Sequence, residues 1–157
     1  MKTKILAILV VVLSCFLSSF KNQQATCKLL LTNTKTNKSI NICEKNSVQK
    51  IEAILGKAIT LDKELPDDKE EPIFTFTFDG LVIEMQNDKI SNLSITNAKW
   101  KLNTASVGIT LAQMITKFER SEFDYFGDPR FKVKDSSAIL FAEVDAAKKI
   151  KKLSVRF

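Results

Sequence analysis

The chain has 157 residues, 45% of them hydrophobic and 27% charged, which is the ordinary balance of one globular domain or two small subdomains. Histidine is absent, which excludes Ser-His-Asp and Cys-His catalysis and most catalytic zinc sites, and leaves carboxylate, Lys, Tyr or Ser–Lys chemistry. Lys2 and Lys4 supply two of the +6 net charges, and the remaining +4 forms no clustered basic footprint, so we expect no nucleic-acid partner.

Residues 1–20 predict a secretion signal. Lys2 and Lys4 form a positive start, and Ile5–Leu13 is an unbroken apolar run followed by small residues. That run is shorter than the roughly 20 residues of a membrane-spanning helix, which favours a signal over an anchor. We therefore expect an exported protein, located in the periplasm, the outer envelope or the extracellular space.

The segment Val12–Cys15 resembles a bacterial lipobox, in which the cysteine is lipidated and becomes the first residue. Leu13 and the apolar residues after Cys15 depart from that pattern, so ordinary cleavage between Ser19 and Ala25 is the alternative. Lipidation at Cys15 would anchor the protein to a membrane, and we expect no other membrane attachment.

Residues 26–43 are expected to form a hairpin closed by a disulfide. Thr26–Asn33 and Lys38–Cys43 both have strand character, and the polar residues between them suit a turn. In a hairpin centred on Lys35, the residue numbers of each cross-strand pair sum to 70. Cys27 would therefore lie opposite Cys43. A disulfide there would stabilise the fold by about 3 kcal/mol through chain entropy. Two buried thiols without a bond are the alternative.

A first helix is expected after the hairpin. Asn46 or Ser47 can cap its start, and Gly56 suits its C-terminal end. Its apolar positions recur at helical spacing: Val48, Ile51, Ile54 and Leu55. The polar and acidic residues 57–72, which include two prolines, are expected to be a loop.

The clearest strand signal is a pair of alternating runs around Asp79-Gly80, which predicts a hairpin with a two-residue turn. The expected pairs, all on the core face, are Phe78 with Leu81, Phe76 with Ile83 and Phe74 with Met85. A third strand, Ile90–Thr96, places Leu93 opposite Ile83 and Ile95 opposite Leu81. Lys99–Asn103, around Trp100, is expected to add a fourth strand.

A second helix starts at a capping box of Thr110 with Gln113 and a hydrophobic staple of Ile109 with Met114. Its expected buried stripe consists of Leu111, Met114, Ile115 and Phe118. After a mixed and charged segment at 119–136, strands are expected at Ala138–Val144 and Ile150–Phe157. In the last strand the inward residues are expected to be Leu153, Val155 and Phe157.

Two segments 60 residues apart, Lys89–Ile95 and Lys149–Val155, share the pattern K-I-x-x-L-S-aliphatic. The two predicted helices also align, at an offset of 63. We interpret these matches as an internal duplication, with two αβ repeats at 45–103 and 107–157. Coincidence between amphipathic segments is the alternative.

The capped helix entered by Gly108–Thr110 and followed by antiparallel strands resembles the β-lactamase-inhibitor-protein-like architecture, which secreted bacterial inhibitors and small envelope-assembly lipoproteins share. Leu55-Gly56-Lys57 is similar to the Leu-Gly-x-Pro helix exit of that architecture, with Ala58 in place of the proline. The resemblance covers residues 45–157 and implies an α+β fold, in which two short helices pack on an antiparallel sheet. It carries over no site residues.

Two acidic segments could carry chemistry. The first, a candidate calcium ligand set without the spacing of a calcium loop, consists of Asp62, Glu64, Asp67, Asp68, Glu70 and Glu71. The second could supply the carboxylate pair of a glycoside hydrolase and consists of Glu122, Asp124 and Asp128 among aromatic residues. We expect a solvated loop at the first and ordinary packing at the second.

Basic residues could form a face for an acidic partner or an anionic envelope surface, with a solvated outer face as the alternative. Trp100 is the candidate anchor, because tryptophan is enriched at binding hot spots, and a core position is the alternative for it. The expected partner-binding residues are Trp100, Lys99, Lys101, Lys149, Lys151 and Lys152.

The sequence therefore predicts an exported, monomeric, non-catalytic protein-binding module of the bacterial envelope or periplasm, either inhibitor-like or assembly-like. We expect no cofactor and no metal. A carboxylate-dependent secreted hydrolase and a purely structural envelope lipoprotein are the alternatives.

Overall fold

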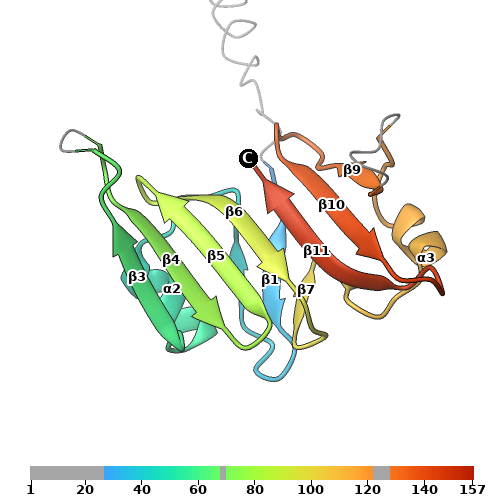
Figure 1. Ribbon diagram of the computed structural model, residues 1–157, viewed down its shortest axis with the longest axis horizontal. Coiled ribbons are helices and arrows are strands. Elements are labelled where there is room, and N and C mark those ends of the chain that lie inside the picture. Colours follow the sequence, from blue (N-terminus) through green and yellow to red (C-terminus); the bar gives the residue numbers. More distant parts are fainter. Residues whose placement is uncertain (1–26, 68–69, 122–127) are drawn as a thin grey trace, which may run out of the picture.

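Figure 1 shows the computed structural model, which describes residues 27–67, 70–121 and 128–157. Within these ranges eleven strands form two antiparallel sheets, and two helices are present: α2 (Val48–Leu55) and α3 (Leu111–Ile115). The segment for which we predicted a secretion signal, including Cys15, lies outside the described residues.

The larger sheet has seven strands in the order β3-β4-β5-β6-β11-β10-β9. Their bounds are β3 (Thr60–Glu64), β4 (Ile73–Phe78), β5 (Leu81–Gln86), β6 (Lys89–Ile95), β9 (Arg130–Lys132), β10 (Ile139–Val144) and β11 (Ile150–Arg156). Alternate side chains of a strand point to opposite faces, so the alternating apolar residues of β4, β5, β6 and β11 bury one face of this sheet.

The smaller sheet has four strands in the order β2-β1-β7-β8. Their bounds are β1 (Leu30–Asn33), β2 (Ser39–Asn41), β7 (Trp100–Leu102) and β8 (Ala105–Ser106). Strands β1 and β7 are distant in sequence but pair directly, with Leu31 opposite Leu102. One hairpin of this sheet precedes α2 and the other precedes α3.

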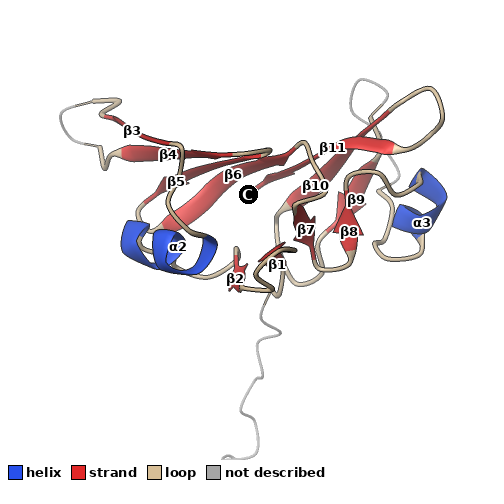
Figure 2. Cartoon of the chain, turned by 90° about the horizontal axis from the view of Figure 1, so that it is seen from below, coloured by secondary structure: helices blue, strands red, loops and turns tan. Residues whose placement is uncertain are grey.

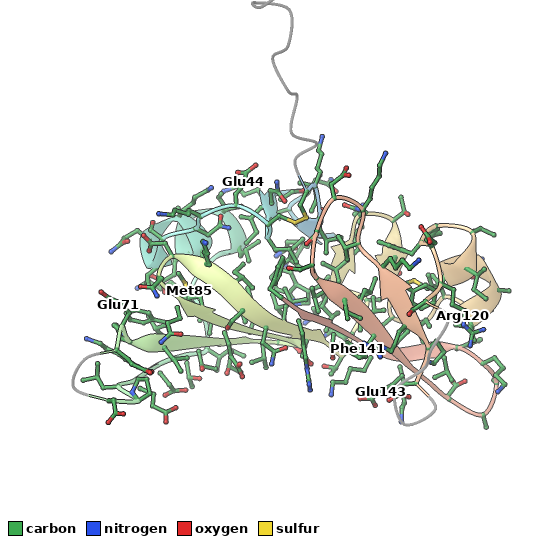
Figure 3. All side chains as sticks on the ribbon, turned by 90° about the horizontal axis from the view of Figure 1, so that it is seen from above. Glu44, Glu71, Met85, Arg120, Phe141 and Glu143 are labelled. Atoms are coloured by element: carbon green, nitrogen blue, oxygen red, sulfur yellow. A yellow bond between two sulfur atoms is a disulfide. The ribbon has the colours of Figure 1, made fainter. Side chains whose placement is uncertain are left out.

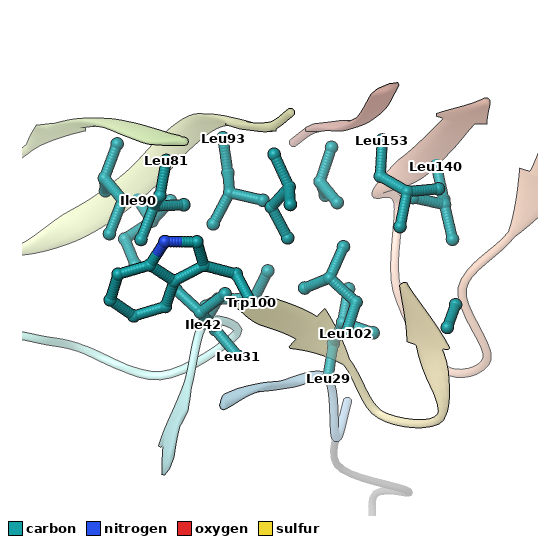
Figure 4. Packing of buried hydrophobic residues seen from close by; sticks show 14 of the residues in the cluster. Leu29, Leu31, Ile42, Leu81, Ile90, Leu93, Trp100, Leu102, Leu140 and Leu153 are labelled. Atoms are coloured by element: carbon teal, nitrogen blue, oxygen red, sulfur yellow. The ribbon is translucent and has the colours of Figure 1, made fainter. Parts of the chain in front are cut away.

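The two sheets lie face to face, and their apolar sides enclose the core (Figure 2). Trp100 and Leu102 of the smaller sheet meet Leu81 and Ile90 of the larger one in this core (Figure 4). Helix α2 flanks one side of the smaller sheet and α3 flanks the other (Figure 2).

The predicted α+β fold is wrong, because the protein is mostly β. A second sheet, rather than a pair of helices, covers the middle of the large sheet, and the helices have only eight and five residues. Lys99–Asn103 is also not a fourth strand of the large sheet, since Trp100–Leu102 pairs with β1. That pairing joins distant parts of the chain, so local periodicity carries no trace of it.

The central meander has the predicted register. Cross-strand partners are Phe78 and Leu81, Phe76 and Ile83, Phe74 and Met85, Ile83 and Leu93, and Leu81 and Ile95. Helix α2 has the predicted cap, because Ser47 accepts a hydrogen bond from the Lys50 N–H. The predicted capping box of Thr110 and Gln113 also begins α3.

The first hairpin differs by one residue from its predicted register. Leu31 pairs with Ile40, so paired numbers sum to 71. Beyond the last pair the Asn41 side chain accepts hydrogen bonds from the N–H groups of Leu29 and Cys43. The predicted disulfide between Cys27 and Cys43 is present, with their Cα atoms 5.8 Å apart. Such bonds persist in oxidising compartments, which agrees with an exported protein.

Two predicted inward side chains instead face solvent: Ile115 is 44% exposed and Phe157 is 43% exposed. Helix α3 ends at Ile115, and the other residues of the predicted stripe, Leu111, Met114 and Phe118, do pack against the core. Three strands were missed: β3 in the segment predicted as a loop, β8 just before the second helix, and β9 in the mixed segment before Ala138.

The two halves of the chain share the larger sheet, because β6 pairs with β11 and places Ser94 opposite Ser154. Both flanking hairpins shift register at a glutamate, between Glu84 and Met85 and between Glu143 and Val144. Each half runs through a hairpin of the small sheet, a capped helix and strands of the large sheet. In this order the β7–β8 hairpin is the counterpart of the β1–β2 hairpin, which groups Trp100–Leu102 with the second half and not with the predicted repeat at 45–103; the duplication itself stays a prediction.

Candidate functional site

The two edges of the seven-stranded sheet differ in how their main chains are satisfied. At the β9 edge, Lys132 N–H donates to the Glu119 carbonyl and Ser121 N–H donates to the Arg130 carbonyl, so the preceding segment covers this edge. At the other edge, no described strand pairs with the outer side of β3. Main-chain groups on that side point to solvent and can pair with an added strand.

Every residue of β3 is exposed, and three large apolar side chains lie on or beside it. Ile59, Leu61 and Leu65 are 70%, 41% and 65% exposed. Leu61 lies opposite the buried Phe76, so it is on the core face of the sheet although it stays exposed. Lys63 lies opposite Phe74, with its ammonium 6.0 Å from the ring centroid. We call this group the β3 margin: Ile59, Leu61, Lys63 and Leu65.

The other face of β3 is acidic. Thr60, Asp62 and Glu64 alternate with the residues of the β3 margin and therefore point to the opposite side of the sheet. This strand thus presents an apolar row on one face and two carboxylates on the other. The sequence contains the alternation Ile59-Thr60-Leu61-Asp62-Lys63-Glu64-Leu65, which could have predicted the strand, but its charged residues led us to expect a solvated loop.

Trp100, the predicted binding anchor, belongs to the core. Its side chain is 4% exposed, its indole N–H donates a 2.9 Å hydrogen bond to the Asp79 carbonyl, and its ring centroid lies 5.6 Å from that of Phe78. Trp100 therefore cannot anchor a partner at the surface, and the prediction for this residue is wrong.

The predicted basic face is divided between two sheets. Lys101 lies between the buried Trp100 and Leu102, so it faces away from the core of the smaller sheet. Lys152 precedes the buried Leu153 and faces away from the core of the larger sheet. These two lysines therefore occupy opposite outer faces of the protein.

The remaining predicted lysines make local contacts or stay exposed. Lys99 forms an ion pair with Asp79 beside the β4–β5 turn, and Lys149 is exposed at the start of β11. Lys151 and Lys152 both approach Glu143, with N–O distances of 3.6 and 3.1 Å. The hydrogen bond from Lys152 lowers the pKa of Glu143 below its ordinary value of 4.5, against a smaller opposing effect of burial.

The two acidic segments are described only in part, because residues 68–69 and 122–127 lie outside the described ranges. Within residues 27–67, 70–121 and 128–157, no group of three or more His, Cys, Asp or Glu side chains could hold a metal ion. Glu122 and Asp124 of the proposed hydrolase pair lie outside the described residues. A cavity of about 500 Å³ at the β9–β10 hairpin is lined by residues that include Glu119 and Lys132, which form an ion pair at 2.8 Å.

Comparison with protein-family models finds no match, and comparisons with curated proteins and with solved structures find none either. In the described part of the chain, no helix has the length and apolar character needed to cross a membrane.

Proposed function

We propose that this chain is a non-catalytic module of the bacterial envelope or periplasm that binds another protein by adding an extended segment of it to β3. The supporting observation is the difference between the two edges of the large sheet: one is covered by the chain's own backbone, and β3 is not. Strand addition to an exposed edge is a common form of peptide recognition, since main-chain hydrogen bonds supply affinity and alternate side chains supply specificity.

The faces of β3 define the partner segment. Residues on one of its faces would pack beside Ile59, Leu61 and Leu65, so they should be apolar. Residues on its other face would lie beside Asp62 and Glu64, so they should be lysine or arginine. The module therefore favours an extended segment in which apolar and basic residues alternate.

A ten-residue peptide of alternating valine and lysine tests this proposal, with a peptide of the same composition in blocks as its control. Fluorescence anisotropy should detect binding of the alternating peptide alone. Amide hydrogen exchange should slow in Thr60–Glu64 on binding, because the outer groups of β3 gain partners.

Two substitutions separate the contributions of the two faces. Leu61→Asp should weaken binding about tenfold or more by removing apolar contact, and Glu64→Lys should do so by opposing the basic residues. Lys35→Glu, at the exposed tip of the β1–β2 turn, is the matched control and should leave binding unchanged. Equal binding of both peptides, or protection away from β3, would refute the proposal.

A further inference from the structure

The second surface of interest is the uncovered side of the seven-stranded sheet. Both helices and the four-stranded sheet lie on one side of it, which leaves the other side without a described helix or strand over it (Figure 2). Figure 3 shows Phe141 and Glu143 on this open side, whereas Met85 lies on the core side. We call the open side the outer face.

Strand register fixes two rows of side chains across the outer face. The first row, from β3 to β9, is Thr60, Thr77, Val82, Ser94, Ser154, Phe141 and Arg130. The second row, in the same order, is Asp62, Thr75, Glu84, Asn92, Arg156, Ile139 and Lys132. Directly paired residues point to the same side of a sheet, so each row is a continuous line on the outer face.

The charges of the outer face are largely segregated, since Glu143, on the β9–β11 half, is paired with Lys151 and Lys152 of the same chain. Acidic residues lie on the β3–β5 half, at Asp62, Glu64 and Glu84. On the other half the guanidinium groups of Arg130 and Arg156 lie 5.4 and 5.6 Å from the centroid of the same Phe141 ring. Cation–π contacts of this kind hold the two positive charges in place.

This pattern is complementary to itself. β6 is the middle strand of the seven, so a two-fold axis along β6 places β5 of one copy over β11 of the other and β3 over β9. Glu84 then faces the second copy's Arg156, and Asp62 faces its Lys132. Ser94 meets its own counterpart on the axis, where a small side chain allows two sheets to approach to about 10 Å.

We infer that the outer face pairs with the outer face of a second copy of this chain about a two-fold axis along β6. Although the sequence led us to expect a monomer, this surface fits an isologous contact between two sheets. Seven strands at about 4.8 Å spacing give a face about 30 Å wide, and about five residues per strand at about 3.3 Å give it a length of about 16 Å, so pairing would bury roughly 1,000 Å² in total. That area is near the lower limit for a specific interface, and the dimer should be weak, with a Kd on the order of 100 μM.

Sedimentation equilibrium of the disulfide-bonded protein between about 10 μM and 1 mM tests the pairing. Wild type should associate in low salt and dissociate as salt rises, because the contacts are between exposed charges. Glu84→Arg alone and Arg156→Glu alone should each raise the Kd at least tenfold. Each places like charges face to face twice in the symmetric dimer.

Charge exchange provides the decisive outcome. The double variant Glu84→Arg/Arg156→Glu should regain wild-type association. An equimolar mixture of the two single variants should form a heterodimer, because both facing pairs are then opposite in charge. Lys35→Glu, in the other layer, should behave as wild type.

If a variant at Glu84 does not fold, the same charge exchange can be made at two other exposed residues. The substitutions are then Asp62→Lys and Lys132→Asp. A wild type that stays monomeric at 1 mM would overturn the inference. So would single variants that associate as tightly as wild type, or exchanges that restore nothing in folded protein.

Discussion

Replacing Trp100 with alanine should destabilise the protein severely, because the indole fills the space between the two sheets. Its side chain is 4% exposed and contacts the Phe78 ring. Removing a buried tryptophan costs about 3–5 kcal/mol through lost burial and the cavity that remains. Loss of the hydrogen bond to the Asp79 carbonyl adds about 1 kcal/mol. Since small domains have about 5–15 kcal/mol of stability, the variant would lose a large part of it.

Urea unfolding followed by far-ultraviolet circular dichroism measures this loss from the midpoint and slope. Trp100→Phe is the matched control, since it retains an aromatic ring and loses the indole hydrogen bond. It should cost about 1–2 kcal/mol, through the lost indole hydrogen bond and the smaller ring, while the Asp79 carbonyl keeps the hydrogen bond from Asn97. If Trp100→Ala lowered the free energy of unfolding by less than about 1 kcal/mol, Trp100 would not occupy the core position described above.

Replacing both Cys27 and Cys43 with alanine should lower the free energy of unfolding by about 3 kcal/mol, because the bond spans 16 residues; calorimetry that finds no change would argue against a structural bond. Gly80→Ala should cost about 2 kcal/mol more than Gly56→Ala in urea unfolding. Both glycines have positive φ, but only at Gly80 would a Cβ overlap the Asn97 amide, so equal costs would show that this contact relaxes freely. The Glu143 carboxyl should titrate below its ordinary value of 4.5 by nuclear magnetic resonance, and Lys152→Met should raise that pKa. Its stabilising effect is present above the pKa of the unfolded state and is lost as pH falls through the lower folded pKa. A titration unaffected by Lys152→Met would contradict the assigned cause.

Local signals identified the elements that have one buried face. Alternation in β4, β5 and β6 determined both strand positions and register, because a shift of one residue would place the apolar side chains in solvent. Ser47 and Thr110 identified the helix starts for a similarly local reason. Their side chains accept hydrogen bonds from N–H groups of the first helical turn, which have no partner within the helix. The first hairpin shifted by one because its turn closes between Asn33 and Lys38, with Asn37 at a positive φ, and local periodicity did not specify that turn.

Long-range pairing was not readable from the sequence. The β1–β7 contact converts two separate hairpins into one sheet, and no local pattern in either hairpin specifies that partner. Trp100 was ambiguous for the same reason, since its burial depends on the sheet opposite it. β3 was missed because its charged residues favoured a solvated loop, although Ile59, Leu61 and Leu65 alternate with polar residues through it.

Site-specific photocrosslinking in cells tests the central proposal most directly. A photoreactive residue in place of Thr60, on the open edge, should crosslink to one protein, and excess protein without the probe should compete for it. The same residue in place of Lys35 should give no such product, and Glu64→Lys should abolish the product formed at position 60. A partner captured equally from both positions, or none from position 60 in cells where the protein is abundant, would contradict binding at β3.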